Sequence, residues 1–427
     1  MVADMQRARM LAWDLPKYGW NVEILAPDKS YQDPLYLDQD SEAFFCPDTP
    51  VHYTQPLHPL PRHLIRSSTI GWKALLPLHA TARTLFARHR YDLVYISTAK
   101  FNLFLLGWWW RKRYGLPYIL DIHDPVYRKS PVFFGGTKPG LKRTLSLLSL
   151  KHIEERTIPT ASALVSVSSK YTEVMMNRYK NHSPDWLLYG HHKVIPFPAC
   201  DRDLLKAMAG VNKIEQHGNE VRRIIYVGAG GPVMLKAFSA LCNAIRLLIA
   251  RQAMPDVLIR FELYGTMLGW KEGDRKQLYE IAQDAGIGEL VCEEPQHVTY
   301  RRSLELLLGA DGVLVLGVDD EGYMPSKLYT YALSGKPLLG VFRRPSDVHD
   351  MFVNNPCLGH MLPYDDNNNN GVEVIAPIKR FIEEVAVRVS LDRWETIRHH
   401  SSQEMARRHS ALFDAVIGSH ISTKGAS

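Results

Sequence analysis

Short apolar segments alternate with helical segments along this chain, and the alternation runs through the sequence twice. In the first half the apolar segments are residues 21–26, 92–97, 117–122 and 163–168. Segments with the apolar spacing typical of helices separate most of them. Because neighbouring parallel strands need a crossover connection, this order predicts βαβ units and a parallel sheet with helices on both faces.

Residues 196–222 interrupt the alternation with two prolines, a short polar helix and a charged stretch. The expected strands after them are residues 223–228, 258–265, 290–292, 312–317 and 337–342. A chain of 427 residues is long enough for two domains of ~200 residues each. The predicted parts are an N-terminal domain at 1–195, a linker at 196–222, a C-terminal domain at 223–390, and a C-terminal helix at 391–427 that packs back toward the N-terminal domain.

The charge of the chain is unevenly distributed. The net charge is +6, but residues 1–195 contain 25 Lys and Arg against 16 Asp and Glu and so carry +9. The remaining residues carry −3. This asymmetry favours an anionic partner for the first half, although a basic half is also common in proteins without such a partner.

Cysteine usage and hydropathy exclude several classes of protein. The five cysteines are scattered, and none forms a C-x-x-C pair, which argues against a disulfide scaffold and a zinc ribbon. No apolar run reaches the roughly 18 residues that span a bilayer. The first ten residues lack the apolar centre of a signal peptide. We therefore expect a cytoplasmic protein without a metal site.

The strongest local signal is the segment at residues 321–341, EGYMPSKLYTYALSGKPLLGV. Pro325 and Ser326 are predicted to open a helix, with Ser326 as its N-cap and Lys327 in its first turn. A helix start with free amides and a nearby lysine favours a diphosphate. The same pattern also fits an ordinary capped helix between two strands, so the spacing alone leaves both interpretations open.

This segment resembles the donor-site segment of family 4 retaining glycosyltransferases, which have the GT-B fold. The other matching motifs are, in order, YDLVYIS, GLPYILDIHDP, ASALVSVSSKYTEVM, RRIIYVGAGG, FELYG and ADGVLVLG. The resemblance implies an α/β chain with two Rossmann-like domains that face each other across a cleft. It further implies that the C-terminal domain binds a nucleotide-diphospho-sugar as co-substrate, that the N-terminal domain binds the acceptor, and that neither a cofactor nor a metal ion takes part.

The resemblance also places a set of donor-site residues in the C-terminal domain. They are Gly228, Gly230, Gly231, Lys236, Gly265, His297, Glu321, Ser326, Lys327 and Thr330. Two positions depart from the family pattern. The second Glu of the family's Glu-x7-Glu pair, which holds the ribose, falls on Thr330, and Lys236 is the only candidate for the displaced basic residues after the Gly loop. These departures allow a degenerate, inactive copy as an alternative.

A second cluster ends the strand predicted at residues 117–122. Asp121, His123 and Asp124 would face the cleft in a GT-B arrangement, and the resemblance implies that they are the catalytic residues. A histidine there can orient sugar hydroxyls and accept a proton. The alternative is a capping aspartate beside a solvated histidine, which is common in βα loops.

Residues 103–113, LFLLGWWWRKR, combine tryptophans with cations. This composition suits a membrane interface. The stretch is equally typical of a buried helix with a basic end. The residues that would form the membrane or acceptor surface are Trp108, Trp109, Trp110, Arg111, Lys112 and Arg113.

Two features near the start of the chain bear on the family pattern. The family's first strand and Gly-rich turn are not found before the helix predicted near Met5, so the first strand is taken as missing. The segment Asp38-Gln39-Asp40 matches the metal-binding D-x-D of another glycosyltransferase fold, but no apolar strand precedes it. We interpret it as a solvated loop.

Taken together, these features predict a retaining glycosyltransferase of the hexosyltransferase type. It would move a sugar from a UDP- or GDP-sugar to a saccharide or lipid-linked acceptor, as in cell-surface polysaccharide synthesis, at the inner face of a membrane and without nucleic acid. The alternatives are a non-catalytic or regulatory homologue and a GT-B nucleotide-sugar epimerase. A nicotinamide-dependent enzyme is disfavoured because no G-x-G-x-x-G follows a first strand.

Overall fold

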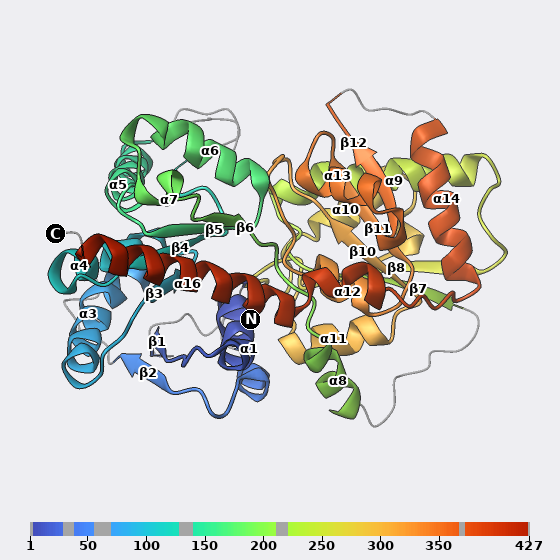
Figure 1. Cartoon of the computed structure of the whole chain (residues 1–427). Coiled ribbons are helices and arrows are strands. Elements are labelled where there is room, and N and C mark those ends of the chain that lie inside the picture. The colour runs from blue at the N-terminus through green and yellow to red at the C-terminus, as the bar shows by residue number, and fades with distance from the viewer. Residues whose placement is uncertain are drawn as a thin grey trace. The chain divides into compact units, whose positions relative to one another are not determined.

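The computed structural model describes residues 3–28, 38–54, 70–127, 140–210, 221–366 and 372–425 (Figure 1). The chain forms two compact units. The N-terminal unit comprises residues 2–37, 45–196 and 405–427, and the C-terminal unit comprises residues 38–44 and 197–404. A short early segment therefore belongs to the C-terminal unit, and the end of the chain belongs to the N-terminal unit.

The N-terminal unit is built on a four-stranded parallel sheet with the order β3-β4-β5-β6. The strands are β3 (Val94–Ser97), β4 (Tyr118–Ile122), β5 (Ala163–Ser166) and β6 (His192–Val194), with a separate parallel pair, β1 (Ile24–Pro27) and β2 (Val51–Thr54). The helices are α1 (Ala3–Asp14), α3 (Ile70–Arg88), α4 (Phe104–Tyr114), α5 (Leu141–Thr157), α6 (Ser169–Tyr179), α7 (Asp185–Leu188) and most of α16 (Ser402–Gly425).

Strand β4 lies inside this sheet, and all five of its residues are buried. Tyr118, Leu120 and Ile122 pack in one apolar core with residues such as Phe104 and Trp186. Side chains on a strand alternate between the two faces, so Asp121 points to the opposite face from these three. A carboxylate at a buried position needs hydrogen-bond partners within the protein.

The C-terminal unit is a six-stranded parallel sheet with the order β12-β11-β10-β7-β8-β9. The strands are β7 (Val221–Val227), β8 (Leu258–Tyr264), β9 (Val291–Glu294), β10 (Gly312–Leu316), β11 (Leu338–Arg343) and β12 (His360–Tyr364). The helices are α8 (Asp201–Gly210), α9 (Leu235–Ala250), α10 (Gln277–Asp284), α11 (Tyr300–Leu308), α12 (Leu328–Leu333), α13 (Asp347–Asn354), α14 (Val372–Ala386) and α15 (Trp394–Ile397).

The strand order in this sheet reverses between β7 and β10. The chain adds β8 and β9 on one side of β7 and then returns to place β10 on the other side. In open parallel sheets, the loops at the carboxyl ends of two such strands diverge and leave room for a ligand. The topology therefore directs the search for a site to the loops that follow β7 and β10.

Helix α9 packs against α14 and covers one face of this sheet (Figure 1). The segment Pro232–Ala250 is long and apolar enough to cross a membrane by length and hydropathy alone. Phe238, Leu241 and Ile245 of this helix are buried in the core of the C-terminal unit. Its apolar composition is therefore explained by packing on the sheet.

All nine predicted strands are present in the structure, within a few residues of the expected ends. Three strands were not predicted, namely β2, β6 and β12. Each is short and contains histidine, proline or other polar residues, so none shows an apolar run. The long C-terminal helix is present as α16, but it begins later than residue 391, because α15 and a 3-10 turn at Arg398–His400 precede it.

Candidate active site

The loop after β7 contains the three glycines that the sequence placed at a phosphate. Gly228 N donates to Tyr264 O at 3.0 Å, and Gly230 N donates to Thr266 O at 2.8 Å. A Cβ atom on Gly230 would lie 2.7 Å from Thr266 Cβ, whereas one on Gly231 would meet nothing within 4 Å. Close packing on the end of β8 therefore explains Gly230, and the amides of Gly228 and Gly230 are already engaged within the protein.

Lys327 lies in the connection that follows β10, and its side chain reaches the same end of β7. Its Nζ atom donates to the carbonyl oxygen of Val227, the last residue of β7, at 2.9 Å. Tyr331 OH donates to the same oxygen at 3.1 Å. Burial lowers the pKa of Lys327 to about 8. This ammonium group thus lies beside the glycine loop, bound to a neutral acceptor.

The helix that carries Lys327 begins later than the sequence indicated. Helix α12 starts at Leu328, its N-cap is Lys327, and no side chain caps it. The prediction of Ser326 as N-cap was therefore wrong, and Ser326 is half-buried in the preceding turn. Thr330 is buried within α12, and Glu321 is exposed before it.

His297 and Gly265 lie in the loops that follow β9 and β8. Gly265 adopts a positive φ of 71° and donates its N–H to Glu294 O at 2.9 Å. Burial lowers the pKa of His297, and the charge of Lys327 lowers it further while Asp38 opposes the shift. The electrostatic influence of Lys327 on this imidazole indicates that the two side chains share one region of the C-terminal unit.

Asp38 is not the solvated residue that its polar surroundings predicted. Its Oδ2 atom accepts a hydrogen bond from Tyr300 N, at the first residue of α11, at 2.7 Å. A carboxylate at a helix N-terminus is stabilised by the free amides and the helix dipole. Within the described part of the chain, no group of three His, Cys, Asp or Glu side chains is arranged to hold a metal ion.

Lys236 follows the glycine loop but is held by two carboxylates. Its Nζ atom lies 2.6 Å from Asp319 and 3.2 Å from Asp366. The bond to Asp319 raises the pKa of Lys236. Arg343, at the end of β11, pairs with the same two acids at 2.5 and 2.8 Å. The sequence did not indicate Arg343, because only the order of strands brings it to this edge.

In the N-terminal unit, His123 and Asp121 form a close pair at the end of β4. His123 Nε2 lies 2.6 Å from Asp121 Oδ2, and both residues are buried. Asp124 is exposed, so it does not share the buried environment of the other two predicted catalytic residues.

The segment after His123 is fixed by a buried carboxylate on α5. Glu154 accepts from Tyr127 N at 3.0 Å and from Tyr179 OH at 3.0 Å, and it pairs with Arg178. Arg178 in turn donates to Tyr127 O at 3.4 Å. These bonds hold the backbone four residues beyond His123.

The three tryptophans of α4 all have contacts inside the N-terminal unit. Trp110 is buried and donates to His79 Nδ1 at 3.0 Å, and Trp109 stacks on the same imidazole at 3.9 Å between ring centroids. Trp108 is half-buried, with Arg156 over its ring at 5.0 Å. Among the predicted basic residues, Arg111 is bound by Asp185 at 2.8 Å.

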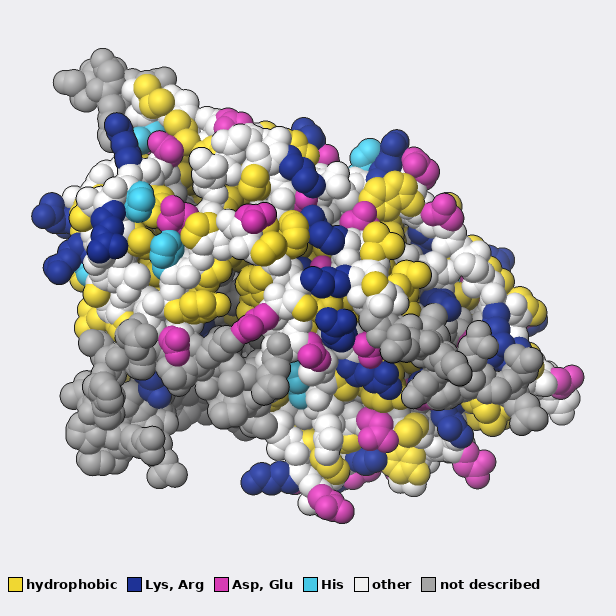
Figure 2. All heavy atoms as spheres, turned by 90° about the horizontal axis from the view of Figure 1, so that it is seen from below, with side chains coloured by type: hydrophobic (Ala, Val, Ile, Leu, Met, Phe, Trp, Pro, Cys, Tyr) yellow, Lys and Arg dark blue, Asp and Glu magenta, His cyan; other side chains and the backbone are white. Residues whose placement is uncertain are grey.

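Lys112 and Arg113 are exposed at the end of the same helix. On the face of the molecule drawn in Figure 2, Lys and Arg side chains are interspersed with Asp and Glu. That face therefore carries both signs of charge.

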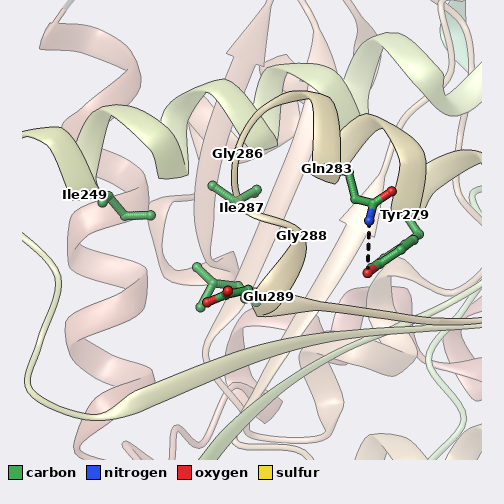
Figure 3. A pocket seen from close by; sticks show the side chains of 8 residues that line it. Ile249, Tyr279, Gln283, Gly286, Ile287, Gly288 and Glu289 are labelled. Carbon is green, nitrogen blue, oxygen red and sulfur yellow. Dashed lines mark hydrogen bonds between the residues drawn. The ribbon is translucent and has the colours of Figure 1, made fainter.

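A separate hollow lies at the amino end of β9 (Figure 3). It is lined by α9, α10 and the turn that enters the strand, and Gln283 donates to Tyr279 OH across its rim at 3.3 Å. Ligands in parallel sheets bind at the carboxyl ends of the strands. This hollow is at the opposite end of β9, so we do not include it in the candidate site.

Comparison with known proteins bears on the N-terminal unit first. Residues 6–176 match the model of the glycosyl transferase 4-like domain. No curated protein matches the sequence. The match over residues 6–176 confirms the resemblance to family 4 glycosyltransferases that the sequence motifs indicated.

Solved structures extend the likeness beyond the glycosyl transferase 4-like domain. Sucrose-phosphate synthase from Thermosynechococcus elongatus is similar with a TM-score of 0.58 at 15% identity, over 96% of this chain and 92% of that one. HepE of Anabaena, in complex with UDP and glucose, is similar with a TM-score of 0.58 at 14% identity, over 97% and 96%. These similarities confirm the predicted GT-B fold with two Rossmann-like domains.

Proposed function

We propose that this protein is a retaining glycosyltransferase that uses a nucleotide-diphospho-sugar as donor. The observation that carries the proposal is the position of the Lys327 ammonium group. It lies at the end of β7, beside the glycine loop, where the strand order of the sheet reverses. The glycosyl transferase 4-like domain supports the transferase class. A UDP-sugar is favoured because similar structures contain UDP with glucose in HepE and UDP-2-fluoro glucose in the trehalose-6-phosphate protein of E. coli.

The chemistry assigns separate roles to the two units. The diphosphate gains negative charge as the bond between sugar and oxygen breaks, so a cation fixed at that oxygen stabilises the transition state. Lys327 supplies this charge in the proposal without a metal ion. His123 contacts the transferred hexose and receives or donates a proton.

The acceptor and location belong to the same proposal. We propose a saccharide or lipid-linked acceptor, in cell-surface polysaccharide synthesis, at the cytoplasmic face of a membrane. The support is the +9 charge of residues 1–195 and the exposed Lys112 and Arg113 at the end of α4.

A catalytically inactive homologue is the second candidate. Thr330 is buried where the family pattern has a ribose-binding glutamate, and Lys236 is paired with Asp319 and Asp366. Such a protein would bind a nucleotide-sugar without transferring the sugar.

One pair of measurements tests the proposal. Because a ligand that binds only the folded state raises its stability, UDP or UDP-glucose should raise the Tm, and NAD should not. The stabilising donor is then assayed for release of nucleoside diphosphate with saccharide acceptors. Stabilisation without turnover would favour the inactive homologue, and no stabilisation by any nucleotide-sugar would overturn the proposal.

A further inference from the structure

The carboxylate of Asp121 is the centre of a buried polar network in the N-terminal unit. Its Oδ2 atom lies 2.6 Å from His123 Nε2, 2.7 Å from Tyr95 OH and 2.9 Å from Ser97 Oγ. Arg7 Nε from α1 lies 3.2 Å from the same oxygen. Asp121 and Arg7 are both 0% exposed. A fully buried carboxylate cannot reach a substrate, so its contribution passes through the groups bound to it.

The charge state of Asp121 decides what it does to His123. Burial by itself would raise the pKa of Asp121, but the charge of Arg7 and the interactions with His123 and Tyr95 outweigh burial and hold the pKa below the ordinary value. The carboxylate is therefore ionised, and an ionised carboxylate only accepts hydrogen bonds. The atom that faces it, His123 Nε2, must carry the proton. In the neutral ring, Nδ1 then carries the lone pair.

Helix α16 contacts the network through Tyr95. Burial lowers the pKa of His409 to about 3, so this imidazole is neutral. Its Nδ1 atom donates to Met405 O at 2.8 Å, which leaves Nε2 as an acceptor 3.2 Å from Tyr95 OH. The hydroxyl has one proton, and its bond to Asp121 is shorter at 2.7 Å. Tyr95 thus donates mainly to Asp121 and helps to fix the carboxylate.

We infer that Asp121 is a positioning residue that keeps the proton of His123 on Nε2 and presents the imidazole to the transferred sugar in a single tautomer. This inference rests on the proposed function. It changes the role given to Asp121 by the sequence, because the carboxylate orients the imidazole and does not itself take part in the chemistry. Arg7 and Tyr95 hold Asp121 in place for this task.

The tautomer of His123 in the wild-type protein tests the inference without any assay of transfer. Multiple-bond 15N–1H correlation spectra, assigned by the signals lost in His123→Ala, distinguish a proton on Nε2 from one on Nδ1. We expect the Nε2-protonated form under conditions in which the ring is neutral. A ring protonated on Nδ1 would overturn the inference. This result is independent of the donor, so a failure of the proposed function does not affect it.

Two variants connect the tautomer to catalysis. Asp121→Asn offers an amide in place of the carboxylate, and we expect loss of the Nε2 preference and a fall of about 100-fold in kcat with unchanged nucleotide affinity. Tyr95→Phe removes a neighbouring donor but keeps the bond to His123, so its tautomer should remain and kcat should fall by less than about tenfold.

An Asp121→Asn variant that keeps both the tautomer and kcat would contradict the inference. Equal effects of Asp121→Asn and Tyr95→Phe on the tautomer and on kcat would also contradict it. If Asp121→Asn does not fold, the wild-type spectrum decides by itself.

Discussion

The two regions proposed to act on one donor are built in opposite ways. At the end of β4, side chains bond to one another around a buried carboxylate. At the end of β7, a lysine bonds to a backbone carbonyl, and no carboxylate of the described residues pairs with it. In the first arrangement, the side chains satisfy one another without a ligand, and their bonds fix the orientation of the His123 imidazole. The second leaves a cation whose full stabilisation requires an anion, as expected of a site that binds a diphosphate and releases it.

The largest effect on activity should come from the polar network at the end of β4. His123→Ala removes the ring that is proposed to contact the sugar, and we expect kcat to fall by ~100-fold or more. Nucleotide affinity should not change, because the proposed donor site lies in the C-terminal unit. The transfer rate and the UDP affinity are measured on one purified variant. Loss of both together with a lower Tm would show that His123 is only structural, and retention of both would remove it from the site.

The lysine at the end of β7 should produce a smaller loss of a different kind. Lys327→Ala removes the proposed charge-assisted phosphate contact, worth ~1.5–3 kcal/mol, and should weaken UDP binding by about tenfold or more. Titration calorimetry with UDP measures this. Lys327→Arg keeps the charge and serves as the control. A Lys327→Ala variant with unchanged affinity would exclude this lysine from the donor site.

The same lysine predicts a pH dependence of donor binding. Since its pKa is about 8 in the free protein, Lys327 is charged below that pH and loses its proton above it. UDP affinity should therefore be constant near pH 7 and decline as the pH rises through about 8. In Lys327→Arg the decline should be absent over this range, because arginine stays protonated. A wild-type affinity that is flat to pH 9.5 would show that the ammonium does not contact the phosphates.

The sequence predicted the strand ends well and the contacts at those ends poorly. A buried strand with a polar end can be recognised from local pattern, which is why His123 and the glycine loop were placed correctly relative to β4 and β7. The partners were not predictable, because Arg7, Asp121 and His409 are far apart in the sequence. Likewise, the bond between Lys327 and Val227 depends on the strand order of the sheet. No local signal specifies such contacts.

A substitution in the glycine loop tests whether close packing is the reason for a glycine at position 230. Gly230→Ala places a methyl group 2.7 Å from Thr266 Cβ and 2.9 Å from Leu278 Cδ1, which should cost about 1–3 kcal/mol of unfolding free energy. Gly231→Ala is the matched control, since its added Cβ has open space and its φ is −64°. Urea denaturation measures both. Equal stability of the two variants would show that the loop adjusts and that packing does not explain Gly230.

The smallest expected effect concerns the surface charge of the two halves, +9 for residues 1–195 and −3 for the rest. The tryptophans of α4 have partners inside the protein, so any contact with an anionic bilayer there must come mainly from the exposed Lys112 and Arg113. Each cation near such a surface contributes about 1 kcal/mol. The double substitution Lys112→Ala and Arg113→Ala should therefore reduce sedimentation with phosphatidylserine vesicles at low salt.

The matched control removes Arg251 and Lys271, two exposed cations of the C-terminal unit. Because that half is acidic overall, their loss should leave vesicle binding unchanged. Binding through charge must also weaken as salt shortens the Debye length to ~8 Å at physiological ionic strength. If the wild-type protein does not sediment with the vesicles at low salt, the membrane would have to be dropped from the proposed function. The positive charge of residues 1–195 would then serve an anionic acceptor or no anion at all.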